Sequence, residues 1–363
     1  MYSSSDNLKI VSLRQNWNCN ERVEASMVRE KSCLVLFAFL VLVLFALNLF
    51  FGSVDMPAMQ VVDALLGREP EVSSSYFIVM ESRLPQALTA LLCGAALAAC
   101  GLMLQTVFRN PLAGPSILGI DSGASLGVAL VMLLSGGNMV ASSWGLGGFL
   151  ATTAAAFAGA MGVMALLLFF STLLKSDVML LITGVMISYA VSSVISLLNF
   201  FATAEGVHSY MVWGMGSFGG VSMGQLFWLS ISLGMGILIA ISLVKPLNAL
   251  LLGYNYAKNL GINVNRVRML LLLATGLLSA TVTAFCGPIS FLGLAVPHVA
   301  RFILHKADHR FLMPLSLLVG SAVALLCNLL CVLPGDRGLI PLGIVTPLLG
   351  VPVVFLVLLR GRR

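Results

Sequence analysis

Residues 94–127 read GAALAACGLMLQTVFRNPLAGPSILGIDSGASLG, and they join two long apolar runs. The first run begins near residue 84, and the second begins near residue 116. Between them lie Arg109 and two helix-breaking prolines, Pro111 and Pro115. About 20 apolar residues cross the ~30 Å hydrocarbon core of a bilayer as a helix. The stretch therefore predicts two membrane spans joined by a short basic connection.

The composition of the whole chain agrees with a membrane protein. Of its 363 residues, 59% are hydrophobic and only 9% are charged, and the mean hydropathy is +1.02. A soluble domain carries about 25% charged residues. The sequence therefore predicts an all-α polytopic membrane protein. Its net charge of +6 lies in short loops beside apolar runs, where it sets topology and does not indicate nucleic-acid binding.

The apolar runs predict about ten transmembrane helices. Their expected ranges are 33–51, 84–108, 116–135, 146–174, 178–203, 223–244, 269–286, 289–305, 312–333 and 341–359. Only the Gly287-Pro288 break separates the seventh from the eighth. Residues 1–32 form a polar N-terminal segment, and residues 33–363 form the membrane domain.

The basic residues orient these spans. With ten spans and both termini in the cytoplasm, the outer segments hold only Arg68, Arg83 and Arg337. The other 17 Lys and Arg residues fall in cytoplasmic segments. This bias is the positive-inside pattern of a multi-pass membrane protein.

Motifs for energy conversion or catalysis are missing from the sequence. A phosphate-binding loop of the G-x-x-x-x-G-K-[ST] type requires a lysine after a glycine, and no lysine in the chain follows one. None of the four histidines lies in an H-E-x-x-H pattern. His305 and His309 fall in a basic cytoplasmic turn, where solvated roles are expected. The sequence therefore predicts no catalytic residue, no metal site and no cofactor, which disfavours an intramembrane enzyme.

One acidic residue, Asp121, is expected inside the membrane. An ion-coupled secondary transporter keeps intramembrane acids despite their cost of about 2.5–3.5 kcal/mol each. Asp121 lies five residues into its span, beside Ser122 and Gly123. We expect it to cap a helix N-terminus or to lie at the interface. The secondary-transporter reading therefore has little support.

A polar stripe runs along the fifth expected span. Ser188, Ser192, Ser196 and Asn199 recur at steps of 4, 4 and 3, which places them on one face of a helix. Such a stripe can line a wetted pathway. Alternatively, serine hydroxyls bond back to carbonyls four residues earlier or join neighbouring helices. The spacing alone leaves both readings open.

Small residues predict where helices approach closely. Gly94, Ala98 and Gly101 recur along the second span. On the fourth span the equivalent residues are Ala154, Ala158 and Gly162. Such positions let helix backbones pack tightly.

Several motifs resemble one family, the permease subunits of bacterial ATP-binding-cassette (ABC) importers for iron-siderophores, haem and vitamin B12. The resemblance extends over nearly the whole chain from residue 33. Besides residues 94–127, the motifs are RLP at 83–85, YMVWGMGSFGG at 210–220, LGYNYAKNLGINVNRVR at 252–268, GPISFLGLAVPHVARF at 287–302, DHR at 308–310 and PLGIVTPLLGVPVVF at 341–355.

This resemblance implies a bacterial inner-membrane permease without catalytic activity. It implies a homodimer around a central pathway, in contact with membrane lipid, with two cytoplasmic ABC ATPase subunits and an extracytoplasmic substrate-binding protein. The expected cargo is an iron-siderophore-type chelate, and the alternative cargo is vitamin B12 or haem.

The resemblance also assigns residues 245–268 as the cytoplasmic loop that couples to the ATPase. Gly253 and Gly261 are expected to mark turns between short helices. Ala257 and Leu260 are the apolar contacts expected against the ATPase. Tyr254 and Lys258 belong to the same contact, and Lys258, Arg266 and Arg268 suit an acidic rim or lipid headgroups.

The same resemblance favours a pathway along the polar stripe. Ser176 and Asp177, just before it, match the position of the cytoplasmic gate. Two copies of Asp177 facing across the dimer axis would repel each other, which would ease opening.

Docking of the binding protein is expected to use arginines on the outer surface, here Arg83 and Arg337. The sequence departs from the family pattern close to these positions. Gln86 and Val332 stand where arginines are usual, Asn328 stands where an aspartate is common, and Leu339-Ile340-Pro341 replaces an ELP motif.

Overall fold

The computed structural model describes residues 29–68, 73–134, 146–174, 176–333 and 338–360. Within these ranges, seven helices are long and apolar enough to cross a membrane: Arg29–Phe50, Ser74–Val107, Gly148–Leu173, Asp177–Phe201, Met223–Ser242, Val264–Cys286 and His309–Val332. Three shorter apolar helices are Ile120–Leu134, Leu292–Leu304 and Leu342–Leu356. Together they occupy the ten predicted spans, and the polytopic all-α fold is confirmed.

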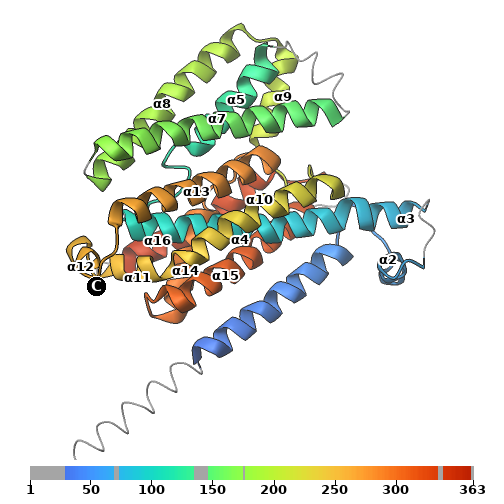
Figure 1. Cartoon of the computed structure of the whole chain (residues 1–363). Helices are drawn as coiled ribbons and strands as arrows, with labels where there is room; N and C mark the ends of the chain where they lie inside the picture. The colour runs from blue at the N-terminus through green and yellow to red at the C-terminus, as the bar shows by residue number, and fades with distance from the viewer. Residues whose placement is uncertain (1–28, 69–72, 135–145, 175, 334–337, 361–363) are drawn as a thin grey trace, which may run out of the picture.

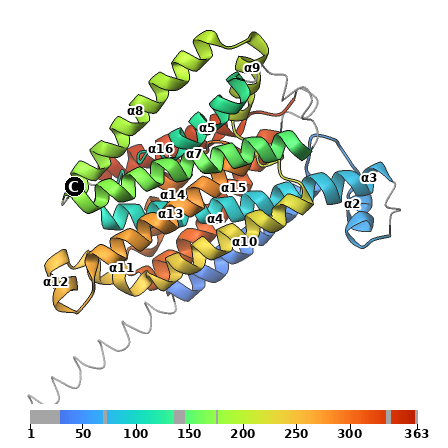
Figure 2. The same cartoon turned by 45° about the horizontal axis from the view of Figure 1, so that its top comes forward.

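The helices form two packed groups (Figure 1). One contains α5 (Ile120–Leu134), α7 (Leu146–Leu173), α8 (Asp177–Phe201) and α9 (Ala204–Gly214). The other contains α4 (Leu84–Val107), α10 (Met223–Ser242), α13 (Val264–Cys286), α14 (Leu292–Leu304), α15 (His309–Val332) and α16 (Leu342–Arg360). One apolar core lies within the second group, and the other lies where α5, α7 and α8 pack against α4 and α13, as with Leu104 and Leu272. Figure 2 shows α8 at the outer edge of the first group.

Short helices occupy the two opposite ends of the bundle (Figures 1 and 2). At one end, α2 (Ala58–Leu65), α3 (Ser74–Phe77) and the π-helical stretch η1 (Ile78–Arg83) lead into α4. At the other end, α11 (Val244–Leu251) and α12 (Tyr254–Asn259) lead into α13. Given the predicted orientation, the first end is the outer one and the second is cytoplasmic.

The central helix α4 packs through glycine, as its sequence predicts. A Cβ on Gly94 would lie 2.3 Å from the carbonyl oxygen of Gly320 on α15. A Cβ on Gly101 would lie 1.5 Å from the carbonyl oxygen of Gly293 on α14. The backbones of α4, α14 and α15 therefore touch at positions that admit no side chain.

On α7 the predicted small-residue face is wrong. Ala154 and Ala158 are exposed, and a Cβ on Gly162 would meet nothing within 4 Å. The close contacts are one residue further round the helix, where Gly159 and Ala155 meet α5. One residue turns a helix by about 100°, so a small-residue pattern in an Ala-rich run does not identify the packed face.

Two spans are helical for only part of their length. The helix α5 has 15 residues and α14 has 13, which at about 1.5 Å per residue gives only ~22 and ~20 Å. The non-helical segments 110–119 and 287–291 precede them. Gly293 of α14 packs against Pro115, and the His298 Nε2 lies 2.7 Å from the Pro111 carbonyl oxygen. Irregular backbone at membrane depth is tolerated where it packs against protein or lines a cavity, as these contacts and the exposed Ser116 indicate.

Candidate functional site

The predicted coupling loop folds as two short helices separated by glycine. Gly253 (φ +117°) separates α11 from α12, and Gly261 (φ +78°) follows α12. Both positions lie in the region that L-residues rarely adopt, so glycine is needed there. The predicted turns are confirmed.

The exposed part of this loop is a small mixed surface, the α12 tip, made of Tyr256, Lys258 and Leu260. Tyr256 is 50% exposed and Leu260 is 59% exposed. Ala257 is fully buried in the core, so the expected contact between Ala257 and the ATPase is wrong. The sequence did not distinguish the two faces of α12 because this helix has only six residues.

Tyr254 faces inward from α12, towards the N-terminal end of α8. Its hydroxyl is hydrogen-bonded to the Asp177 carboxylate and lies 2.9 Å from the carbonyl oxygen of Val107. The guanidinium of Arg109 lies 4.5 Å from the centre of the Tyr254 ring. Burial and the neighbouring Asp177 carboxylate raise the pKa of the Tyr254 phenol, so the phenol stays protonated as a donor at neutral pH.

Arg268 completes this group, which we call the Asp177 cluster: Asp177, Tyr254, Arg109 and Arg268. The Arg268 guanidinium lies 3.7 Å from the Asp177 carboxylate, and its side chain is only 11% exposed. The expectation that Arg268 faces an acidic rim or lipid is therefore wrong. Asp177 is paired inside its own subunit, which removes the basis for repulsion between two unpaired copies. The cluster joins α12 directly to the start of α8.

The polar stripe on α8 has features of both alternatives, a wetted pathway and serine hydroxyls bonded to backbone carbonyl oxygens. The Ser188 hydroxyl donates to the Gly184 carbonyl oxygen at 3.0 Å, and the Ser196 hydroxyl donates to the Ser192 carbonyl oxygen at 2.9 Å. These are the back-bonds of the structural reading. Ser192 and Ser196 also line a polar cavity of 370 Å³. Asn199, one helical turn further on, has a buried side-chain oxygen with no hydrogen-bond partner.

Asp121 lies against this cavity, in the first turn of α5. Its Oδ1 accepts hydrogen bonds from Ser279 at 3.0 Å and Thr283 at 2.9 Å, both on α13. Its Oδ2 accepts one from Ser116 at 2.7 Å. Of the two expectations, the capping role is wrong, since Asp121 is the second residue of α5 and its carboxylate binds three side-chain hydroxyls. Two of the donors could not be predicted from the sequence, because Ser279 and Thr283 are more than 150 residues from Asp121.

The docking role expected for Arg83 is also wrong. Arg83 is 5% exposed, and its guanidinium donates to the carbonyl oxygens of Leu49 at 2.9 Å, Phe50 at 2.8 Å and Val54. It thus binds the end of the N-terminal span and is unavailable to an external glutamate. Arg337 lies outside the described residues.

Gln86 and Asn328, two residues that depart from the family pattern, are in contact. The Gln86 side-chain amide donates to Asn328 Oδ1 at 2.9 Å, and the Asn328 amide donates to Asn48 Oδ1 at 2.8 Å. This chain of neutral amides links α4, α15 and the N-terminal span. Val332 is buried, and Leu339 is 60% exposed.

The solvated role expected for His309 is wrong, because its side chain is buried. It is 1% exposed, and its ring nitrogens lie 2.8 Å from the Thr106 hydroxyl and from Asn248 Oδ1. Only His305 of the cytoplasmic pair is exposed, as expected. In the described ranges, no group of three or more His, Cys, Asp or Glu side chains is placed to bind a metal ion.

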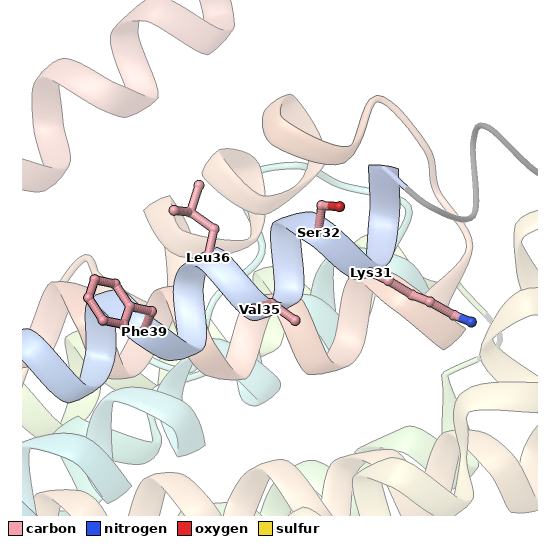
Figure 3. A pocket seen from close by; sticks show the side chains of 5 residues that line it. All are labelled: Lys31, Ser32, Val35, Leu36 and Phe39. Atoms are coloured by element: carbon pink, nitrogen blue, oxygen red, sulfur yellow. The ribbon is translucent and has the colours of Figure 1, made fainter.

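A second hollow, of 590 Å³, lies along the N-terminal span and is separate from this site. It is lined by Lys31, Ser32, Val35, Leu36 and Phe39, all on one helix (Figure 3). Its walls are largely apolar, as expected of a surface that contacts lipid. Such a surface offers no chemistry for a polar cargo.

In the part of the chain that the structure describes, ten apolar helices form a bundle with an exposed tip at one end and a cavity lined by polar side chains, as expected of a membrane permease. Residues 40–360 match the model of the FecCD transport family. Over 285 residues the chain is 36% identical to the vitamin B12 import system permease protein BtuC of Salmonella typhi and to that of Escherichia coli O9:H4 (strain HS). Each alignment covers 78% of this chain and 84% of the relative.

A solved structure gives the same result. It is described as an inward-facing conformation of an ABC transporter assigned to the metal-chelate type, and it matches with a TM-score of 0.78 and 29% identity. The match covers 91% of this chain and 99% of the other. The chain belongs to the FecCD transport family: it is the multi-pass permease subunit of a bacterial ABC importer and is not itself catalytic.

Proposed function

We propose that this permease carries vitamin B12 or a closely related corrinoid into the cell. The observation that carries the proposal is the 36% identity to the BtuC permeases over most of both chains. The polar cavity beside α8 supports it, because no Lys, Arg or His is among the described residues that line it. A neutral cargo rich in amides needs no cation in its path.

An iron-siderophore-type chelate is the second candidate cargo. The specific observation in its favour is the similarity to the metal-chelate type transporter. The BtuC relatives are more similar in sequence, at 36% against 29% identity, so the corrinoid is the first choice.

The assembly that we propose has two copies of this chain, two cytoplasmic ATPase subunits and one external binding protein. The outward face of α8 supports the pairing of two copies, since Tyr189 is 68% exposed and Phe200 is 79% exposed. A second copy would cover these side chains. Ser192 and Ser196 are exposed on the same side of α8, within about 60° of Tyr189 around the helix. Both serines would then lie beside a pathway between the two copies.

The α12 tip is the proposed contact with the ATPase. When the ATPase subunits close on ATP, α12 moves with them. The Asp177 cluster transmits this movement to α8, because the Tyr254 hydroxyl and the Asp177 carboxylate join the two helices. Ser176 and Asp177, at the cytoplasmic end of α8, remain the proposed gate.

Leu260→Arg tests the ATPase contact. The substitution places a charge on a 59%-exposed apolar position without disturbing the core. Truncating or reversing a central contact of an interface costs about 2 kcal/mol or more, so we expect at least a ~30-fold weaker association. The measurement is co-purification of the ATPase with the permease from detergent extracts.

Leu339→Arg is the matched control for this test, because Leu339 is similarly exposed, at 60%, and is expected on the outer side. It should leave co-purification unchanged. Full retention of the ATPase by Leu260→Arg would contradict the proposed contact. Ala257→Arg is not a useful variant, since it would bury a charge in the core.

The cargo is tested by uptake into proteoliposomes that contain the complete importer and its binding protein. We expect ATP-dependent uptake of radiolabelled vitamin B12 that exceeds the uptake of a ferric hydroxamate chelate by about tenfold or more, which corresponds to roughly 1.4 kcal/mol of discrimination. Preferential uptake of the ferric chelate would overturn the corrinoid assignment and leave the permease assignment intact.

A further inference from the structure

The 370 Å³ polar cavity is bordered by both irregular segments of the membrane domain. Ser116 comes from the segment before α5, Pro288 and Ser290 come from the segment before α14, and Tyr210 comes from α9. At roughly 30 Å³ per molecule, the volume holds about a dozen waters. Ser116, Ser192 and Ser196 are exposed, so the cavity opens to the outside of the subunit, and its polar groups need water or a polar ligand.

The cavity wall carries charge of one sign only among its described residues. It presents the Asp121 carboxylate and the hydroxyls of Ser122, Ser125, Ser192 and Tyr210. No cationic side chain is among the described residues that line it. A carboxylate offers only acceptor sites when ionised, whereas a hydroxyl both donates and accepts. The wall therefore favours ligands that donate hydrogen bonds.

The Asp121 carboxylate is held in place before any ligand arrives. Three hydroxyl donors from outside its own helix fix both oxygens, at 2.7 Å from Ser116, 3.0 Å from Ser279 and 2.9 Å from Thr283. Each carboxylate oxygen has two lone pairs, so Oδ2, with one donor, has acceptor capacity left over. A fixed acceptor at the edge of a cavity loses little conformational entropy when it binds a ligand.

We propose that this cavity is a contact site for the passing cargo, which takes neutral or cationic groups rich in N–H donors, such as primary amides, and disfavours carboxylates. The assignment rests on the proposed import function for its biological meaning. The cavity is too small for a whole corrinoid, so it contacts one edge of the cargo. The site thus adds a charge filter inside the permease to the selection made by the binding protein.

The charge preference of the cavity is measurable without cargo or ATPase. Ser192→Cys places a thiol on the cavity wall, and Ser193→Cys places one on the next, exposed position of α8. The full-length permease in membranes is treated with a cationic trimethylammonium-ethyl methanethiosulfonate or an anionic sulfonatoethyl methanethiosulfonate. The chain without an added cysteine gives the background from its native thiols. The ratio of cationic to anionic labelling rates at Ser192→Cys is divided by the ratio at Ser193→Cys.

A cleft of one sign concentrates counter-ions and raises association rates by about 10- to 1,000-fold. We therefore expect the normalised ratio to be about ten or higher. Adding Asp121→Asn should bring it close to one, and Asp121→Glu, which keeps the charge, should preserve it. Equal ratios at the two cysteines would overturn the proposal. A high ratio that persists in Asp121→Asn would overturn the role of Asp121.

Transport gives the second readout. In the reconstituted importer, we expect vitamin B12 to enter at least about tenfold faster than its monocarboxylic acid, in which one amide is replaced by a carboxylate. Asp121→Asn should reduce this difference, after correction for binding to the external protein. If neither compound is transported, the proposed function fails; the labelling result still decides the charge preference of the cavity.

Discussion

Gly101→Ala is expected to destabilise the permease more than any other single methyl addition to its central helix. The added Cβ would lie 1.5 Å from the carbonyl oxygen of Gly293 and 2.5 Å from its carbonyl carbon. Both are backbone atoms of α14, so no side chain can rotate away, and the helices must separate. Overpacking of a core costs about 1–3 kcal/mol and occasionally more, and we expect the upper end of that range.

The measurement is the thermal unfolding temperature in detergent, together with the monodisperse fraction after extraction. Gly162→Ala on α7 is the matched control, because its new Cβ would meet nothing within 4 Å. That variant should be neutral or slightly more stable, since alanine favours helix over glycine by about 1 kcal/mol. An unchanged unfolding temperature in Gly101→Ala would show that α4 and α14 are not in backbone contact.

Tyr254→Phe is expected to uncouple ATP hydrolysis from transport. The substitution removes the hydroxyl that binds the Asp177 carboxylate and leaves the ring beneath Arg109. A hydrogen bond to a charged group contributes about 1.5–3 kcal/mol, which is a ~10- to 100-fold change in an equilibrium. We expect the number of cargo molecules imported per ATP hydrolysed to fall by about tenfold or more, with the ATPase still bound.

Tyr256→Phe is the matched control on the same helix, since Tyr256 is 50% exposed and lies on the α12 tip. It should leave the transport ratio within about twofold of the parent, as expected for a surface change of roughly 0.5 kcal/mol or less. Asp177→Ala, measured in parallel, should change the basal ATPase rate of the assembled importer. Normal coupling in Tyr254→Phe would exclude the Asp177 cluster as the link between α12 and α8.

The membrane fold was largely predictable because it depends on apolar run length and loop charge. Each of the ten expected ranges overlaps an observed helix. Run length and loop charge can both be read from neighbouring residues in the sequence. The side of α7 that packs against α5 could not be predicted, because Ala and Gly occupy several sides of this helix. The true start of α5 and α14 could not be predicted either. An apolar run predicts the length of a membrane span, but not the length of the helix within it, because irregular backbone can occupy part of the span.

The site was less predictable, because its interactions join distant residues. Arg83 has the charge expected of a docking residue, but the carbonyl oxygens that bind it come from residues 49, 50 and 54. Arg268 likewise resembles a solvated loop cation and is paired with Asp177, more than 90 residues earlier. The turns at Gly253 and Gly261 were predictable because the backbone conformation there requires glycine.

The two short helices α5 and α14 have a consequence for how the protein is made. Each is too short to cross a bilayer by itself, and the segment in front of α5 packs against α14, where Gly293 meets Pro115 and His298 bonds to the Pro111 carbonyl oxygen. A translocon that released spans one at a time would insert α5 before this partner helix had been synthesised. Stable insertion of α5 therefore depends on α14, so biogenesis of this permease is cooperative over more than half its length.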